Sequence, residues 1–410
     1  MSLNSLAGVR VIDLSHVIAG PTASHYLALE GAEVIKIEHP HKGDISRGGG
    51  RDPLDDGISI DFAAINGAKK SVAIDLKHPR CKDWLKDLIR GADVFIENFR
   101  PGAVQGLGFG YEVVEALKPD IVYASISGFG QEGRWGERTA YDHIVQSAVG
   151  MAMMQGLEGQ DPVKVGFPVV DTATGMIGAQ AILAALLRRF RTGQGAYLDI
   201  SMAQSALQLM WPEAARAGVK KHDAPRIGNR GFSGSPGAAC FRCEDGWLAT
   251  AANTFAQFRK LCEVVGLPDV PDDPDLIDQQ ALDRGGFVVA ADPTRLSRML
   301  DEAVGVFSAQ VLETLLLERE VPCARLARLS DFLAKVQTGG WMTLPQRQTA
   351  YPGGTLTDFG AGYQADHRPG QALAAAPRLG QHTADVLLAL GAQQEELDQL
   401  SAQGMIRMQP

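Results

Sequence analysis

The chain has 410 residues, of which 45% are hydrophobic and 21% charged, and its formal net charge is −9. That length exceeds what one hydrophobic core usually supports, so two or three domains are expected. The acidic balance, without a long basic run, argues against nucleic acid as a partner. No apolar stretch reaches the roughly 18 residues that span a bilayer, so no membrane partner is expected either.

Cysteine usage and the first residues indicate the compartment. The cysteines are scattered rather than arranged as a disulfide framework, which is typical of a reducing environment. The opening MSLNSLAGVR lacks the basic-then-apolar pattern of a signal peptide. We therefore expect a cytoplasmic protein. The five cysteines are Cys81, Cys240, Cys243, Cys262 and Cys323.

The first half of the chain alternates short β-branched segments with helical patterns. Helices are expected at about 21–30 and at 79–90, where apolar residues recur on one helical stripe. Such alternation predicts an α/β fold with a parallel sheet covered by helices on both faces. The predicted strands are 9–15, 32–38, 71–75, 92–98 and 121–127.

The second half contains a long helical pattern at 175–190, a strand at 196–202 and a hairpin at 239–252 that turns at Asp245-Gly246. Helical segments then continue to about residue 336. Gly/Pro-rich loops come next, and the chain ends with a helix at about 380–403. The predicted organisation is a large domain whose N-terminal part is 1–200, a linker at 201–228, a small domain at 229–336, and a linker plus the C-terminal part of the large domain at 337–410.

Asp171 is the most informative single residue, in the stretch GFPVVDTATG. An Asp directly before a helix is a preferred N-cap, so a purely structural role is one interpretation. The same position suits a nucleophile, because the positive end of the helix stabilises an ionised oxygen and the small residues at 172–175 leave room for an electrophile. Both interpretations stay open on the residues alone.

Other motifs are less specific. His16 follows the first predicted strand, at the edge where parallel sheets bind ligands, and is either a ligand-facing or a structural histidine. His143 favours a structural role. Cys240 and Cys243 have the spacing of a redox or metal pair, but positions i and i+3 of a strand face opposite sides, so no metal site is expected. The turn after the first strand, SHVIAGP, is not a dinucleotide fingerprint.

Eight stretches, spread over almost the whole chain, resemble the class III CoA-transferases, the formyl-CoA transferase-like family. This family is related to carnitine CoA-transferase and α-methylacyl-CoA racemase. The stretches are GVRVIDLSHVIAGP, GAEVIKIEHP, NGAKKSVAIDL, ADVFIENFRPGA, AYDHIVQSAVGM, VVDTATG, ILAALLRRFRTGQGAYLDISM and APRLGQHTADVLLALG.

The resemblance implies an interlocked homodimer, with a Rossmann-like large domain built from both chain ends and a smaller α+β domain. It implies coenzyme A as a cosubstrate with no tightly bound cofactor, and acyl-CoA and carboxylic acids as substrates. Asp171 becomes the catalytic aspartate, and the family's mobile glycine loop falls near 231–237. The CoA-contacting positions become Val17, His39, Ile74, Lys77, Asn98, Phe99, Arg100, Thr139 and Asp142, and the substrate pocket His16, Ile18, Tyr141 and Gly234.

The chain also departs from the formyl-CoA transferase pattern. Ile18 replaces a glutamine and His39 an arginine, and two further basic CoA contacts fall on Gly106 and Thr139. We therefore expect a small organic or dicarboxylic acid other than oxalate. Lys69 and Lys70 are expected to support the CoA phosphates, since the net charge alone repels them.

Two alternatives remain. An α-methylacyl-CoA racemase exchanges an α-proton with a His and an Asp, but it has its His where this chain has Tyr141. A non-catalytic CoA-binding protein would bind CoA without turnover.

Overall fold

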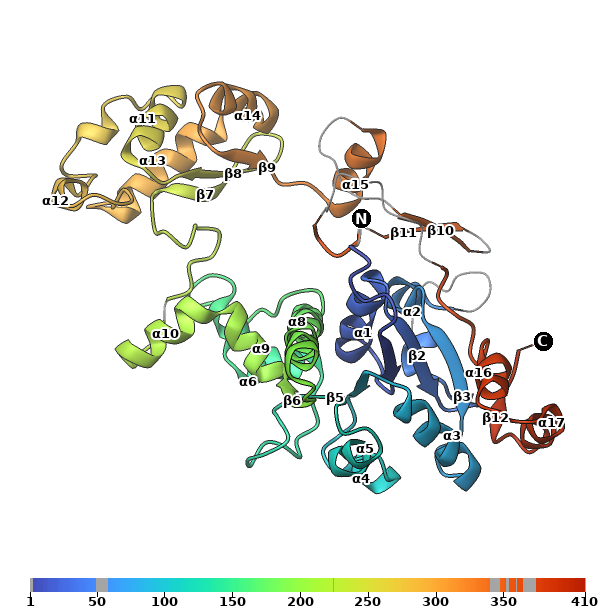
Figure 1. Ribbon diagram of the computed structural model, residues 1–410. Coiled ribbons are helices and arrows are strands. Elements are labelled where there is room, and N and C mark those ends of the chain that lie inside the picture. Colours follow the sequence, from blue (N-terminus) through green and yellow to red (C-terminus); the bar gives the residue numbers. More distant parts are fainter. Residues whose placement is uncertain are drawn as a thin grey trace. The chain divides into compact units, whose positions relative to one another are not determined.

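The computed structural model describes residues 3–48, 58–223, 225–339, 347–351, 354–358, 360–363 and 374–409. The chain divides into two compact units (Figure 1). The first consists of 1–151, 164–222 and 344–410, and the second of 152–163 and 223–343. Both ends of the chain therefore belong to the first unit.

A seven-stranded sheet forms the centre of the first unit, in the order β12-β3-β2-β1-β4-β5-β6. Six strands are parallel, and β12 runs antiparallel to β3. This confirms the predicted α/β class with a parallel sheet. The strands are β1 Arg10–Asp13, β2 Glu33–Glu38, β3 Lys70–Ile74, β4 Val94–Glu97, β5 Val122–Ser127, β6 Ala196–Ser201 and β12 Ile406–Arg407.

Both faces of the sheet are buried, because side chains alternate between two apolar clusters. Val11 of β1 belongs to the cluster under α1 (Ala19–Leu29) and α8 (Val169–Thr192). Its neighbour Ile12 belongs to the opposite cluster, with Trp84 of α3 (Pro79–Arg90). The C-terminal helices α16 (Thr383–Ala389) and α17 (Gln394–Ala402) complete that second cluster. In Figure 1 α16 lies beside β3, about 300 residues earlier in the chain.

The prediction of one final helix at 380–403 is wrong, because this segment forms two helices, α16 and α17. Gly391 lies between them with φ of 90°, a conformation that L side chains rarely adopt. The other helical segments of the first unit are η1 Ile45–Arg47, α2 Ile60–Asn66, α4 Ala103–Leu107, α5 Tyr111–Leu117, α6 Asp142–Ala148, α9 Met202–Leu209 and α10 Trp211–Lys220, with α7 Met151–Met154 at the unit boundary; β10 Arg347–Tyr351 pairs with β11 Gly354–Asp358.

Helix α8 is longer than predicted and packs closely on α1. A Cβ atom at Gly175 would lie 2.5 Å from the Cβ of Thr22 on α1, and one at Gly178 would lie 3.3 Å from that of Ala23. The small residues after Asp171 thus serve helix packing. By length and composition α8 is also apolar enough to cross a membrane, contrary to the sequence expectation, but half of the relevant window is buried in the protein, as in an ordinary core helix.

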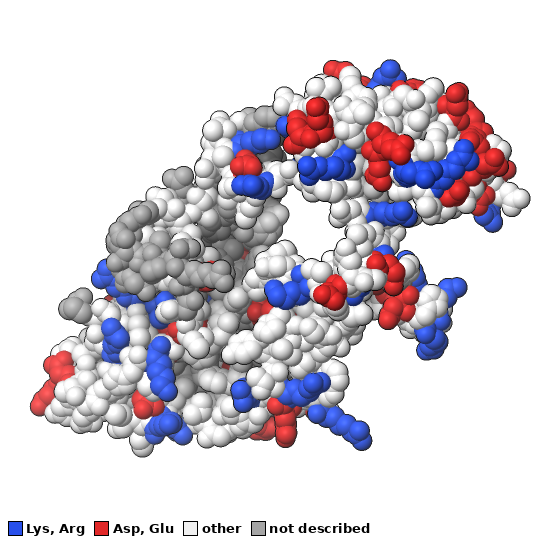
Figure 2. Space-filling model, turned by 180° about the vertical axis from the view of Figure 1, so that it is seen from behind, with Lys and Arg blue, Asp and Glu red and all other residues white. Residues whose placement is uncertain are grey.

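The second unit is a small α+β body. Strands β7 (Gly237–Arg242) and β8 (Trp247–Ala252) form the predicted hairpin, and β9 (Cys323–Arg325) extends it antiparallel. On the face seen in Figure 2, acidic and basic side chains are interspersed over this unit. Its helical segments are α11 Phe255–Val264, η2 Val270–Asp272, α12 Gln279–Asp283, α13 Pro293–Gly305, α14 Ala309–Glu318 and α15 Leu329–Thr338.

Candidate active site

A cavity opens at the carboxyl ends of β1 and β4. The strand order reverses here, since β2 and β3 continue on one side of β1 while β4 to β6 continue on the other, and such a switch point is the usual ligand site of an open α/β sheet. The cavity has a volume of about 220 Å³. Nine residues singled out from the sequence line it: His16, Val17, Ile18, Asn98, Phe99, Arg100, Thr139, Tyr141 and Asp171.

The loops after β1 and β4 are joined to each other. Asn98 accepts the backbone N–H of His16 at 2.8 Å and donates its side-chain amide to the carbonyl of the same residue, also at 2.8 Å. The imidazole of His16 stands edge-on to Phe99, with ring centroids 5.6 Å apart. Burial, and secondarily Lys36, lowers the pKa of His16, so a neutral imidazole faces the cavity at neutral pH.

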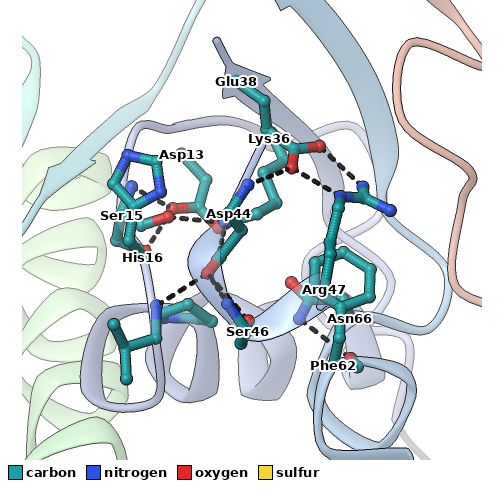
Figure 3. Close-up of polar contacts among 12 residues, drawn as sticks. Asp13, Ser15, His16, Lys36, Glu38, Asp44, Ser46, Arg47, Phe62 and Asn66 are labelled. Carbon is teal, nitrogen blue, oxygen red and sulfur yellow. Dashed lines mark hydrogen bonds and ion pairs between the residues drawn. The ribbon is translucent and has the colours of Figure 1, made fainter. Parts of the chain in front are cut away.

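Val17 has a backbone conformation that is rare for its type. Its φ is 69°, in the left-handed region where a β-branched residue is strained. Asp44 accepts the backbone N–H of Val17 at 3.1 Å, which anchors the strained peptide. The same carboxylate also accepts the backbone N–H and the hydroxyl of Ser46 (Figure 3). Such strain persists only where the surroundings hold it.

A buried ion network supplies that support. Lys36 of β2, fully buried, pairs with Asp44 at 2.9 Å and donates to the carbonyl of Ser15 at 2.5 Å. Asp13 at the end of β1 pairs with Lys69 at 3.3 Å. Burial raises the pKa of Asp13, but Lys69 and Lys36 outweigh it and bring the value to about 2. The network thus fixes the loop that carries His16 to Ile18 (Figure 3).

The expectation that Lys69 and Lys70 help to bind phosphate is wrong on this geometry. Lys69 is buried and donates to Asp13, Ser24, Asn66 and the carbonyl of Pro21, so its donors are committed to the protein. Lys70 pairs with Glu33 at the start of β2, at the opposite edge of the sheet from the cavity.

Asp171 lies in the first turn of α8, which begins at Val169. The N-cap interpretation is therefore wrong: the cap position belongs to Pro168, and no side-chain cap bond forms there. Among the described residues no hydrogen bond or ion pair to the Asp171 carboxylate is found. Burial, and next the nearby Asp142, raises its pKa to about 7. A partnerless carboxylate facing a cavity is the arrangement that a nucleophile or base requires.

Asp142 has a role that the sequence did not suggest. Its carboxylate accepts the backbone N–H groups of Val170 at 2.7 Å and of Asp171 at 3.0 Å. The other oxygen accepts the side-chain amide of Gln146 at 2.5 Å. Asp142 does not line the cavity, in contrast to the CoA contact that the resemblance implies.

The remaining wall carries two arginines. Arg100 and Arg138 both line the cavity, and neither forms an ion pair within the part of the chain that the structure describes. The guanidinium of Arg138 stacks on Trp135, 4.3 Å from the ring centroid, and lies 5.6 Å from that of Phe129. Stacking of this kind orients a guanidinium and leaves its edge donors for an anion.

Three predicted CoA contacts and Gly234 lie elsewhere. Ile74 ends β3, Lys77 follows it, and His39 follows β2, so they stand at the same edge of the sheet as the cavity without lining it. Gly234 belongs to the second unit, where it lines a separate cavity of about 370 Å³ with a φ of 70°. The lid role of 231–237 stays a prediction.

The lining residues that the sequence did not point to include Ser127, Gly128, Arg138 and Met202. Two of them could be predicted from the sequence, because Ser127 ends β5 and Met202 directly follows β6. Ligands bind at the carboxyl ends of parallel strands, so the residues that end or follow the later strands are candidates as well as those after the first strand. Arg138 carries no sequence signal of its own.

The fold and the site define an open α/β protein with a cavity at its strand-order switch point. Among the described residues, the cavity is lined by one carboxylate without a hydrogen bond or ion pair and by two arginines without an ion pair. A family model described as CoA-transferase family III matches residues 6–383. The chain belongs to this family.

The curated relatives of this chain are named for more than one CoA-transferase activity. The succinyl-CoA:glutarate CoA-transferase of Mus musculus is 39% identical over 272 residues, which are 66% of this chain and 62% of that protein. The chain thus spans less than two thirds of the length of that relative. The formyl-CoA:oxalate CoA-transferase of Streptomyces coelicolor is 31% identical over 430 residues, which are 99% of this chain and 100% of that protein.

Solved structures agree with the fold. A CAIB/BAIF family protein from Brucella suis superposes with a TM-score of 0.80 at 25% identity, covering 94% of this chain and 99% of that chain. A protein from M. tuberculosis superposes with a TM-score of 0.77 at 26% identity, covering 93% and 98% of the two chains.

Proposed function

We propose that the protein is a CoA-transferase that moves CoA from an acyl-CoA thioester to a free carboxylic acid, with Asp171 as the nucleophile. The observation that supports this proposal is the Asp171 carboxylate itself. It is largely shielded from solvent, has no partner among the described residues, and lines the cavity. A carboxylate in water is a weak nucleophile because it is well solvated, whereas one kept from water in a site can attack a thioester.

The chemistry runs through two kinds of covalent intermediate, a mixed anhydride and a thioester of Asp171. An oxygen of Asp171 attacks the thioester carbonyl, the C–S bond breaks, and CoA leaves as a thiolate from a mixed aspartyl–acyl anhydride. The thiolate attacks the aspartyl carbonyl and releases the first acid, which leaves an aspartyl-CoA thioester. The second acid attacks that thioester, and the same steps in reverse give the new acyl-CoA and free Asp171. Two easier steps replace one difficult step.

The pKa of Asp171 suits this cycle. A value of about 7 leaves a substantial ionised fraction at neutral pH. It also makes the oxygen more basic, and therefore more nucleophilic, than an ordinary exposed aspartate. The first turn of α8 places the positive end of a long helix beside the carboxylate, which favours the charge that returns when the intermediate breaks down.

For the acid we propose a dicarboxylate longer than oxalate. Beyond Asp171, the charged side chains that line the cavity are Arg100 and Arg138, so the wall favours an anionic group. Ile18, Phe99 and Met202 add apolar surface to the wall, which suits a methylene chain. The name of the mouse relative, which refers to succinyl-CoA and glutarate, is consistent with such an acid.

For CoA we propose that the phosphates meet Arg100, Lys77 and His39. These side chains follow β4, β3 and β2, at the carboxyl edge of the sheet that also holds the cavity. A cavity of about 220 Å³ is too small for the whole of a drug-sized ligand, so a long cofactor must extend beyond it along this edge.

Racemisation is the second candidate, because a carboxyl group with a pKa of about 7 also suits general acid–base chemistry. It needs a second proton-transfer group. His16 lines the cavity, whereas Tyr141 stands where the resemblance places the racemase histidine and His143 is not among the lining residues. The transferase is therefore favoured.

The test uses purified protein with succinyl-CoA as donor and glutarate, butyrate and oxalate as acids, with products followed by mass spectrometry. We expect new acyl-CoA with glutarate, loss of turnover in Asp171→Asn, and a larger KM increase for glutarate than for butyrate in Arg138→Gln. Deuterium exchange at the α-carbon of a 2-methylacyl-CoA, without any need for an acid, would instead indicate the racemase. CoA binding without either reaction would indicate a non-catalytic protein.

A further inference from the structure

Helix α8 has no capping residue of its own. Its cap position is Pro168, which has no side-chain acceptor. The first N–H groups of a helix lack intrahelical partners and must find others. The N–H of Val169 bonds to the carbonyl of Phe167, and Thr172 starts the regular ladder by bonding to Pro168. The two groups between them, at Val170 and Asp171, both point to Asp142.

Asp142 is itself held in place. It is the first residue of α6 and is almost fully buried. Gln146, one turn later and completely buried, donates its amide to Asp142 and accepts the backbone N–H of Val165 at 2.8 Å. Three N–H donors around the two oxygens suit an acceptor-only carboxylate. The chain is thus fastened to α6 both before α8, at Val165, and in its first turn.

This arrangement links the cavity wall to the carboxylate of Asp171. The segment that directly precedes α6 contains Arg138, Thr139 and Tyr141, which line the cavity. Asp142, the first residue of α6, then holds the backbone N–H of Asp171. Because both oxygens of Asp142 are used within the protein and it does not line the cavity, its geometry is that of a support, not of a ligand contact.

We propose that Asp142 is a positioning residue for the transfer reaction, which holds the first turn of α8 so that Asp171 faces the thioester, and that it does not bind CoA. The inference rests on the proposed function for its kinetic consequence, but its structural part does not. A misplacement of about 1 Å can cost about 100-fold in rate, so the support has a measurable role.

The experiment compares Asp142→Ala, Asp142→Asn and, as a matched control, Asp385→Ala, which removes an exposed first-turn aspartate from α16. We expect Asp142→Ala to lower kcat by about 100-fold while KM for the acyl-CoA stays within about twofold. Asp142→Asn should recover part of the rate, since its amide oxygen still accepts N–H groups. Arg100→Ala should show the opposite pattern, a raised KM.

Asp142→Asn also removes a negative charge next to Asp171. The acid limb of kcat/KM should therefore move to lower pH in Asp142→Asn, a change that a merely structural role would not produce. A raised KM with unchanged kcat in Asp142→Ala would mean that Asp142 binds CoA, and wild-type kcat in that variant would equally overturn the proposal.

Hydrogen exchange separates this proposal from the proposed function. The amides of Val170 and Asp171 should exchange faster in Asp142→Ala and keep their wild-type rates in Asp385→Ala. Absence of any transfer by the wild-type protein would remove the proposed function, while unchanged exchange would remove the support. If Asp142→Ala fails to fold, Gln146→Leu removes the donor to Asp142 and should give a smaller effect of the same sign.

Discussion

At the scale of single residues, Asp171 carries a cost for the folded protein. Burial and the charge of Asp142 raise its pKa to about 7, so the ionised form destabilises the native state. The benefit of a carboxylate near a helix N-terminus, typically ~0.3–1 kcal/mol, is smaller than this penalty. A group that costs stability and has no partner among the described residues is typical of a functional site.

The first prediction is that Asp171→Asn stabilises the protein in a pH-dependent way. Between about pH 4 and pH 7 the unfolded chain loses this proton while the native state keeps it, so the stability of the wild type falls relative to the variant. Above about pH 7 the difference should level off at no more than ~4 kcal/mol.

Urea unfolding at several pH values measures this difference. Asp161→Asn, which changes an exposed aspartate, should show no comparable pH dependence. A variant at position 171 that is less stable than the wild type at pH 8 would contradict the account.

Lys36 is a second buried charged residue, and it contacts the loop that carries the cavity residues His16 to Ile18. It is fully buried and paired with Asp44, which holds the strained Val17. Removing one partner of a buried pair leaves an uncompensated charge and costs roughly 3–5 kcal/mol, whereas breaking a surface pair costs below ~1 kcal/mol.

The second prediction uses two lysines of neighbouring strands. Lys36→Met should lower the free energy of unfolding by roughly 3–5 kcal/mol. Lys70→Met should lower it by less than ~1 kcal/mol, because Lys70 and Glu33 are 44% and 33% exposed. Denaturant titrations of both variants measure the comparison, and equal losses would show that the buried network does not have the assigned role.

At the scale of elements, the crossing of α1 and α8 sets the position of Asp171. Gly175 follows that residue by one helical turn, and its backbone lies against Thr22 and the carbonyl of Ala19. An added methyl group would meet the latter at 2.8 Å, and backbone cannot move aside easily. The close approach therefore requires glycine, for packing and not for substrate access.

The third prediction contrasts two helical glycines. Gly175→Ala should destabilise the protein by about 1–3 kcal/mol, since overpacking exceeds the ~1 kcal/mol that alanine gains in a helix. It should also lower kcat, because α8 carries Asp171. Gly218→Ala in α10, with no atom within 4 Å of the added methyl, should be neutral or slightly stabilising. Equal stability of the two variants, measured by thermal unfolding, would disprove the packing argument.

At the scale of the whole molecule, several large apolar side chains of the first unit are exposed. On α8, Leu187 is 52% and Phe190 70% exposed, and at the start of α10 Trp211 is 66% exposed. Exposed apolar side chains of this size are often covered in a protein interface.

The fourth prediction is therefore the homodimer that the resemblance implies, with these side chains buried between subunits. Sedimentation equilibrium at micromolar concentration should give a dimer, and the double variant Leu187→Asp, Phe190→Asp should shift it toward monomer. A wild-type monomer that retains full transfer activity would contradict it.

Much of the sheet was predictable because each strand is a short β-branched run between helical patterns. The start of α8 was not, because Pro168, Val169 and Val170 carry no local helix signal and the cap comes from Asp142, almost 30 residues earlier. The burial of Lys36 was also not predictable from the local sequence. A charge in a strand suggests a solvent-facing position, and its partner Asp44 lies in a loop.

The most direct measurement of the central claim is covalent trapping at Asp171. Hydroxylamine added during turnover should convert the aspartyl-CoA thioester into an aspartyl hydroxamate, seen as a mass shift on the peptide that contains Asp171. The shift should require acyl-CoA and be absent from Asp171→Asn. Transfer that proceeds without any adduct at Asp171, or with an adduct on another residue, would show that Asp171 is not the nucleophile.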